Sequence, residues 1–135
     1  MSTIQIIYIY LLTVPVFFAV DMVWLGLVAN KFYQTHLGYL LGPVNWMAAI
    51  IFYLLYIIGI VVFAIMPGLE ANSITKAIAL GALFGFLAYA TYDLTNLATV
   101  KDWPLIVTMV DLVWGTVLTG TVAAGGYYLA KLFVL

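Results

Sequence analysis

The sequence WMAAIIFYLLYIIGIVVFAIM at residues 46–66 contains no Asp, Glu, Lys, Arg or His. A helix rises about 1.5 Å per residue, so a stretch of this length crosses the hydrocarbon core of a bilayer, which is roughly 30 Å thick. Side chains of this kind cannot form a surface that faces water. The stretch therefore predicts a helix that spans a membrane.

Three further apolar stretches flank this one, at residues 4–29, 74–99 and 105–131. Short connections between consecutive spans favour antiparallel neighbours. Backbone polar groups inside a bilayer must be satisfied within each helix, which agrees with this arrangement. The sequence therefore predicts one domain, residues 1–135, that folds as an all-α membrane protein: a four-transmembrane-helix antiparallel bundle.

Such a bundle places both chain ends on one side of the membrane, here named the terminal side. The polar segment 30–45, predicted as a loop with room for a short interfacial helix, lies on the opposite side, here named the loop side. The connection 100–104 lies there too. Each side receives two of the four Lys residues, so the positive-inside rule leaves the orientation open.

The composition agrees with a membrane protein and excludes several functions. Of 135 residues, 67% are hydrophobic and 7% are charged, whereas a soluble domain carries roughly 25% charged residues. The net charge is −1 and no Arg is present, which excludes nucleic acid as a partner because phosphate binding needs clustered basic residues. The absence of Cys excludes thiolate nucleophiles and cysteine-ligated metals. No cofactor is indicated, and membrane lipid is the expected partner.

Three acidic residues, Asp21, Asp93 and Asp111, lie inside the predicted spans. A charged side chain near the centre of a bilayer costs at least about 2.5 kcal/mol, so three in a chain of this size call for an explanation. Counting the rise along each helix places all three in the loop-side half of the membrane. We expect them to share one interior chamber. A protonated Asp that holds two helices together by a hydrogen bond is the alternative for each.

The neighbours of these acids on their helical faces complete a candidate site. Residues 89, 93 and 96 lie at i, i+4 and i+7, and a Trp follows both Asp21 and Asp111 by three positions. The candidate ligand-binding residues are Asp21, Trp24, Tyr89, Asp93, Asn96, Asp111 and Trp114. No metal site and no catalytic residue is assigned. The same face of the third span continues as Ala77, Gly81 and Gly85, a small-residue pattern that favours close helix packing.

Several short motifs resemble one family over nearly the whole chain. They are DMVWLG at residues 21–26, FY at 32–33, LG at 37–38, YDLTN at 92–96, WP at 103–104 and DLVWG at 111–115. Together they are similar to an uncharacterised bacterial membrane family catalogued as domain of unknown function 2177. The resemblance implies a four-helix, multi-pass protein of the bacterial inner (cytoplasmic) membrane. It brings no established activity or cofactor.

Three functions fit these observations. The favoured one is a carboxylate and aromatic site that binds or transports a small cationic or amphipathic ligand, coupled to protons. The second is a membrane-embedded enzyme that acts on a lipid, with carboxylates as acid and base or as ligands of a divalent metal. The third is a non-catalytic subunit or scaffold that packs against partners through glycine-rich faces. A homodimer would enlarge the small interior of such a bundle and suits the first and third functions.

Overall fold

The computed structural model describes all 135 residues, which form helices and loops without any strand. The helical elements follow the order α1 (Thr3–Trp24), η1 (Leu25–Ala29), α2 (Asn30–Leu37), α3 (Trp46–Ile60), η2 (Val61–Ile65), α4 (Met66–Glu70), α5 (Ile74–Thr99) and α6 (Leu105–Phe133). They join into four long apolar helices, Thr3–Leu37, Trp46–Glu70, Ile74–Thr99 and Leu105–Phe133. The predicted all-α fold is confirmed, and the chain is a multi-pass membrane protein.

Two helices are longer than predicted, and each contains a π-helical turn. The first helix continues to Leu37, so the short helix allowed within the predicted loop at 30–45 is present as α2, joined to the first span rather than separate from it. The π turn η1 takes up an extra residue without breaking the helix. The second helix runs through Pro67 to Glu70 rather than ending at Met66. There the wider turn η2 loosens the backbone just before a proline that has no N–H to donate.

Polar side chains define where three of the long helices begin. The Ser2 hydroxyl accepts a hydrogen bond from the Gln5 amide (3.2 Å), and the Gln5 side chain accepts one from the Ser2 amide (2.9 Å), which completes a capping box. Asn45 accepts from the Ala48 amide at the start of α3. Ser73 accepts from the Lys76 amide at the start of α5. These caps satisfy amide groups that the first helical turn leaves free.

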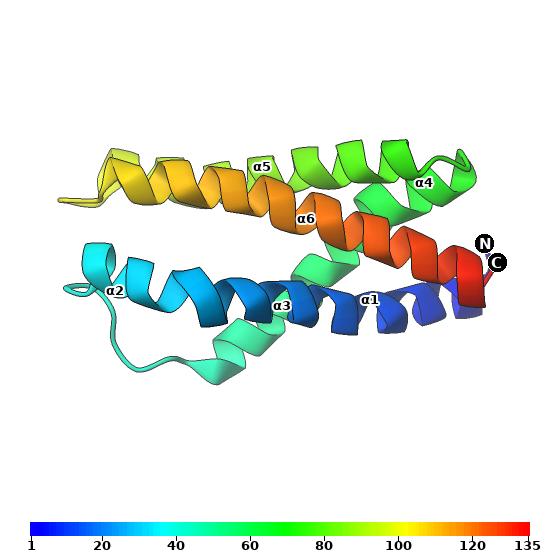
Figure 1. The fold of residues 1–135 in the computed structure, drawn as a ribbon, viewed down its shortest axis with the longest axis horizontal. Helices are drawn as coiled ribbons and strands as arrows, with labels where there is room; N and C mark the ends of the chain where they lie inside the picture. Colours follow the sequence, from blue (N-terminus) through cyan, green and yellow to red (C-terminus); the bar gives the residue numbers. More distant parts are fainter.

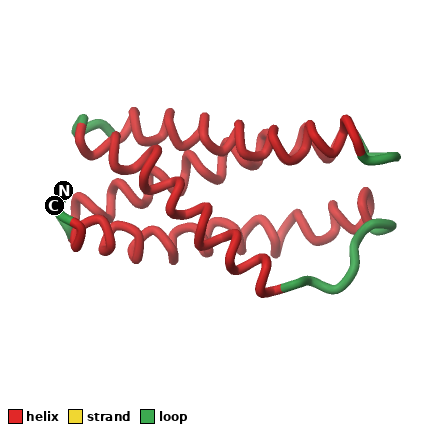
Figure 2. The backbone as a smooth tube through the Cα atoms, turned by 180° about the vertical axis from the view of Figure 1, so that it is seen from behind, coloured by secondary structure: helices red, strands yellow, loops and turns green.

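The four long helices form an up-and-down bundle in which α6 is central. Helices α5 and α6 run side by side along their whole length, and α1 packs on the other side of α6 (Figure 1). The helix made of α3, η2 and α4 crosses the others diagonally (Figure 2). Both chain ends lie at one end of the bundle, opposite the residue 38–45 loop. The terminal side and the loop side are therefore the two ends of the molecule.

Small residues allow the close approach of α5 and α6. A Cβ atom added at Gly81 would meet the Cβ of Ala123 at 2.7 Å and the Thr119 carbonyl oxygen at 2.8 Å. One added at Gly85 would overlap the carbonyl oxygen of Gly115. The small-residue face predicted on the third span therefore packs inside the molecule, with Gly81 and Gly85 against α6 and Ala77 against Gly68 of α4. This face is not free to hold a partner protein, which weakens the scaffold hypothesis.

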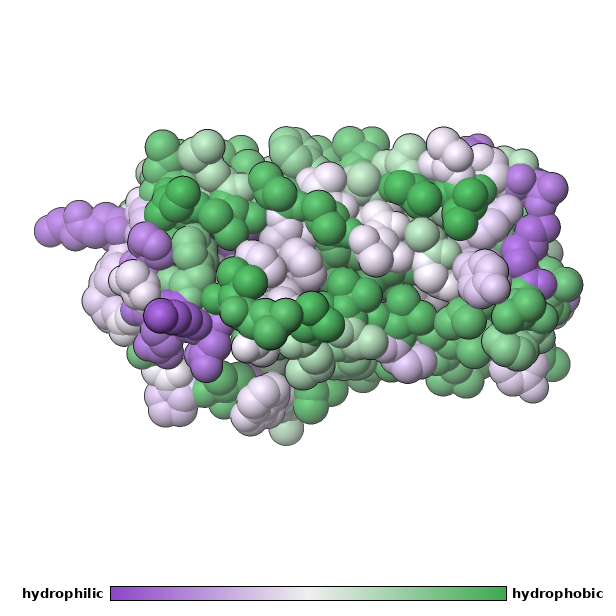
Figure 3. All heavy atoms as spheres, in the orientation of Figure 1, coloured by the Kyte–Doolittle hydropathy of each residue, from purple (hydrophilic) through white to green (hydrophobic).

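The surface has the distribution that a bilayer requires. On the face shown in Figure 3, hydrophilic residues gather at the two ends and hydrophobic residues lie between them. In the terminal-side half the interior is formed mainly by apolar side chains, with Ile57, Ile65 and Leu118 fully buried, and the buried Thr13 hydroxyl bonds to its own helix. The buried acids all lie toward the other half. The fold thus separates a close-packed apolar end from an end with a polar interior.

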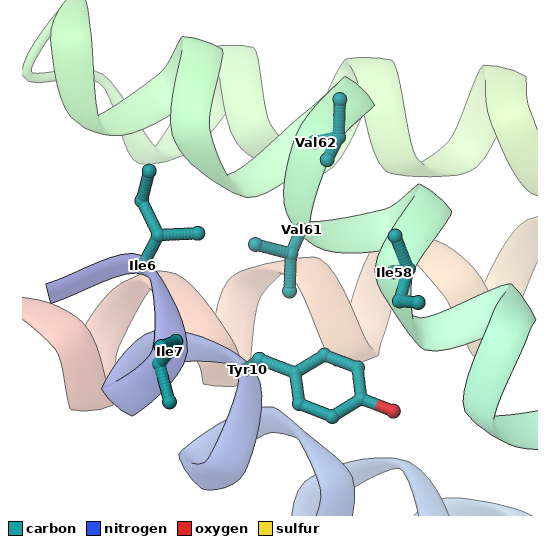
Figure 4. Close-up of a pocket in the computed structure, with 6 residues that line it drawn as sticks. All are labelled: Ile6, Ile7, Tyr10, Ile58, Val61 and Val62. Carbon is teal, nitrogen blue, oxygen red and sulfur yellow. The ribbon is translucent and has the colours of Figure 1, made fainter. Parts of the chain in front are cut away.

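An apolar crevice of about 320 Å³ lies between α1 and the α3–η2 segment (Figure 4). The residues that line it are Ile6, Ile7, Tyr10, Ile58, Val61 and Val62. The Tyr10 hydroxyl donates a hydrogen bond to the Leu54 carbonyl oxygen (3.0 Å). No acidic side chain lines this terminal-side crevice, which makes it a useful control for the site described next.

Candidate functional site

Asp93 of α5 and Asp111 of α6 form a buried pair of acids. Their carboxyl groups are near neighbours, close enough for each to act on the other. Asp93 is 0% exposed and Asp111 is 5% exposed. Neither carboxyl oxygen of Asp93 accepts a hydrogen bond from another group, and the Asp93 carboxyl group lies within hydrogen-bond reach of that of Asp111. Because buried polar groups in proteins are nearly always bonded, the two carboxyl groups must either share a proton or take up a positively charged partner.

A chain of hydrogen bonds fixes the backbone at Asp93 without involving its carboxyl group. The Trp103 indole N–H donates to the Thr108 hydroxyl (3.1 Å), and that hydroxyl donates to the backbone carbonyl oxygen of Asp93 (3.4 Å). The Tyr92 ring packs edge-on against Trp103, with ring centroids 5.9 Å apart. These contacts hold the end of α5 against the start of α6.

Tyr33 is a site residue that the sequence analysis did not select. Its hydroxyl group donates a hydrogen bond to the Asp111 carboxylate. Tyr33 lies on α2, in the segment predicted to be a loop, where no helical face could be assigned to it. Its only signal was its place in the FY motif at 32–33. The helical continuation through η1 is what carries it to Asp111.

Asp21 lies deeper in the bundle than the other two acids. Trp24 of α1 stacks on Trp114 of α6, with ring centroids 4.4 Å apart and planes 9° apart, and this contact sets the register of the two helices. Asp21 precedes Trp24 by three residues, and Asp111 precedes Trp114 by three residues on a helix that runs in the opposite direction. The two acids therefore lie on opposite sides of the Trp stack, with Asp21 about 9 Å deeper than Asp111 by helix rise. It is 5% exposed, one of its oxygens has no partner, and its neighbour is the Tyr53 hydroxyl. The expected single chamber is therefore divided between the acid pair and a separate position.

Tyr89 lies between these two positions. Its ring packs directly against Gly115, where a side chain would collide with it. Its hydroxyl group is within electrostatic reach of both Asp21 and Asp111. Asn96, by contrast, lies beside Tyr92 and has no hydrogen bond to the acids. Four of the seven predicted residues, Asp21, Tyr89, Asp93 and Asp111, thus lie in the polar interior. Trp24 and Trp114 stack on each other at the α1–α6 contact, and Asn96 stands at the edge of the interior.

Two apolar hollows adjoin the acid pair. The α3–α5 pocket has a volume of about 380 Å³ and is lined by Phe52, Ala88, Tyr89 and Tyr92. The α1–α6 groove, of about 370 Å³, is lined by Trp24, Met109, Val110, Val113, Trp114 and Val117. Tyr89 forms a wall of the pocket, and the stacked Trp pair forms part of the groove. Both hollows therefore share aromatic walls with the acid site.

Comparison with known proteins gives a family but no function. The family model for "Predicted membrane protein (DUF2177)" matches residues 6–128. The chain belongs to this family. The match includes every candidate residue from Asp21 to Trp114, and the predicted resemblance is confirmed. No curated protein and no solved structure matches the chain.

The site of this DUF2177 chain has no set of residues for a metal ion. No three His, Asp or Glu side chains lie close enough together to share one. The version of the lipid-enzyme hypothesis in which three Asp residues hold a divalent metal therefore has no ligand set. What the DUF2177 site offers chemically is two adjacent carboxyl groups, one hydroxyl donor and several aromatic faces.

Proposed function

We propose that this DUF2177 protein binds a small cationic ligand at the Asp93–Asp111 pair, in the loop-side half of the bacterial inner membrane. The observation that supports this is the buried Asp93 carboxyl group, which accepts no hydrogen bond from outside the pair and lies directly against a second carboxyl group. An unpaired buried carboxylate is costly, and a cation that bonds to it offsets this cost. Membrane lipid surrounds the protein, and a homodimer is the assembly that would enlarge the interior.

The surroundings of the pair favour a cation over an anion or a neutral polar molecule. No Lys contacts the pair, and the hydrogen bond to Asp111 comes from a neutral Tyr33. Aromatic side chains lie on either side, and an aromatic face attracts a cation by about 0.5–2 kcal/mol. A positively charged group would thus meet two carboxyl groups and several ring faces together.

Binding of this kind is coupled to protons. A cation and a proton compete for the same carboxyl oxygens, so cation binding releases protons. If the site opens to each side of the membrane in turn and exchanges a bound cation for protons, this binding becomes transport. The proton coupling belongs to the pair as a unit, because two adjacent carboxyl groups titrate together.

Calorimetry on the purified protein in phosphatidylcholine nanodiscs tests this function, with tetramethylammonium as the probe. Wild-type protein is expected to bind it, and Asp93→Asn is expected to weaken binding by about tenfold or more, which corresponds to 1.4 kcal/mol. Asp102→Asn is the matched control, because Asp102 is exposed in a loop. Equal binding by the wild type and Asp93→Asn would overturn the proposal.

One observation favours an enzyme acting on a lipid as the second candidate. Tyr33 donates a hydrogen bond to Asp111, and Asp93 lies beside Asp111. A hydroxyl donor next to two carboxyl groups can serve general acid–base chemistry. The two candidates differ in outcome. An enzyme would alter a lipid in the nanodisc over time, whereas a binding protein would leave the lipid composition unchanged by mass spectrometry.

A further inference from the structure

Helices α3 and α5 diverge toward the loop side, and the gap between them indicates a route by which a ligand can reach the site. Tyr56 of α3 stacks on Phe84 of α5, with centroids 5.2 Å apart, so the two helices touch there. One turn closer to the loop side they separate, and the α3–α5 pocket lies between them. Phe52 and Tyr92 at its rim are more than half exposed. In a bilayer those rim residues face lipid chains, so the pocket is open to the membrane rather than to water.

The loop-side end of the bundle, by contrast, is covered. Tyr33 bonds to Asp111, and the Trp103 indole bonds to Thr108. Above them the Tyr39 hydroxyl donates to the backbone carbonyl oxygen of Asp102, which ties the 38–45 loop to the 100–104 turn. Asp93 is fully buried beneath these contacts. A ligand dissolved in water therefore meets a closed surface at this end.

A single side chain, Tyr89, links the lipid-facing pocket to the acids. It lines the pocket, and its hydroxyl group lies within electrostatic reach of Asp111. Tyr89 stands between the pocket and the acid pair, so a ligand that extends from one to the other must displace this side chain. A molecule lodged in the pocket would then have its apolar body among Phe52, Ala88 and Tyr92 and its charged end at Asp93.

We infer that the ligand is a single-chain cationic amphiphile that reaches the Asp93–Asp111 pair sideways from the bilayer, with its chain in the α3–α5 pocket. This inference rests on the proposed function and specifies its ligand. The volume of about 380 Å³ lies near the lower end of small-molecule pockets, which span roughly 300–1,000 Å³. It suits one hydrocarbon chain rather than a two-chain phospholipid. The adjacent Asp93 and Asp111 carboxyl groups supply the complement to a positive head group.

The test compares two probes with the same head group, tetramethylammonium and decyltrimethylammonium, by calorimetry in nanodiscs. Ala88→Phe fills the pocket without touching the acids. It is expected to weaken binding of the decyl compound by about tenfold while leaving tetramethylammonium unchanged. Val62→Phe is the matched control, because Val62 lines the terminal-side crevice of Figure 4, which has no acid. That variant is expected to bind both probes as the wild type does.

A second variant tests the pocket independently in case Ala88→Phe does not fold. Phe52→Ala removes a side chain at the exposed rim and enlarges the pocket, so it is expected to shift the preference toward dodecyltrimethylammonium. Unchanged decyl binding in Ala88→Phe, or an equal loss in Val62→Phe, would overturn the inference alone. Failure of the wild type to bind either probe would overturn the proposed function itself. The two failures are therefore distinguishable in one set of titrations.

Discussion

Tyr33 of α2 donates a hydrogen bond to Asp111 of α6, which lies 78 positions further along the chain. This bond joins the polar end of the first long helix to the acid pair. It also explains why a segment as polar as residues 30–37 stays helical and close to the bundle. The first long helix thus contributes both the deep acid Asp21 and the Tyr33 side chain, which lies over the Asp93–Asp111 pair on the loop side.

Removal of this bond is expected to destabilise the protein. Tyr33→Phe keeps the ring but leaves Asp111 without its donor. Hydrogen bonds between membrane helices contribute about 0.6–2 kcal/mol, so the free energy of unfolding in mixed micelles should fall by that amount. Tyr8→Phe is the control, since Tyr8 is exposed to lipid and makes no side-chain hydrogen bond. Equal stabilities of the two variants would show that the bond contributes nothing.

The π turn η1 is expected to set the direction in which Tyr33 points. One residue inserted into an α-helix turns everything after it by about 100°, and a π turn absorbs such an insertion. Deletion of Leu27, which is exposed, should convert η1 into α-helix and keep Tyr33 facing Asp111. Insertion of one Ala after Leu27 should turn Tyr33 away. Introducing Tyr33→Phe into each background checks this: it should cost stability in the deletion protein and nothing in the insertion protein.

The α5–α6 contact is expected to tolerate no side chain at Gly85. A Cβ there would overlap the Gly115 carbonyl oxygen and approach the Thr119 side chain. Overpacking of this kind costs about 1–3 kcal/mol, so Gly85→Ala should lower the unfolding free energy by that amount. Gly120→Ala is the control, because its nearest neighbour is the Ala82 Cβ at 3.5 Å. A loss in the control as large as that at Gly85 would contradict the packing described.

The two acid positions are expected to contribute unequally to cation binding. Asp21 lies deeper and beside Tyr53, away from the pair. Asp21→Asn should therefore change tetramethylammonium affinity by much less than the tenfold loss expected for Asp93→Asn, about threefold at most, or 0.7 kcal/mol. Calorimetry of both variants in the same nanodiscs makes the comparison. Equal losses would indicate a single chamber that contains all three acids.

Cation binding should strengthen as the pH rises. Protons occupy the carboxyl oxygens at low pH and must leave before a cation binds, so the affinity for tetramethylammonium increases with pH until the pair is fully ionised. In the double variant Asp93→Asn, Asp111→Asn the residual binding should be independent of pH. Titrations in buffers with different heats of ionisation measure the protons released directly. Release of no protons by the wild type would contradict the coupling.

The sequence predicted what hydrophobicity and helical spacing determine. The charge-free stretch 46–66 marked a span, and the small face of Ala77, Gly81 and Gly85 marked a packing surface that α4 and α6 cover. The facing positions of Asp93 and Asp111 followed from their similar depth on adjacent antiparallel helices. These features depend on one helix at a time or on simple counting of its rise.

Features that depend on contacts between helices could not be predicted. The depth of Asp21 relative to the pair follows from the stacking of Trp24 on Trp114, and no single-helix pattern shows that two rings meet. The role of Tyr33 depends on a π turn, which has no sequence signature as clear as a proline or a cap. The α3–α5 pocket results from the slant of α3, which is set by packing on its neighbours.

The slant of α3 also bears on the bilayer around the protein. Along the long axis of the molecule, α3 begins well inside the level reached by the ends of α2, α5 and α6 (Figure 1). Trp46, exposed at that start, is a residue type that settles among lipid head groups. A shorter apolar span is matched by local thinning of the membrane. The leaflet should therefore dip beside α3 and bring polar head groups down toward the rim formed by Phe52 and Tyr92.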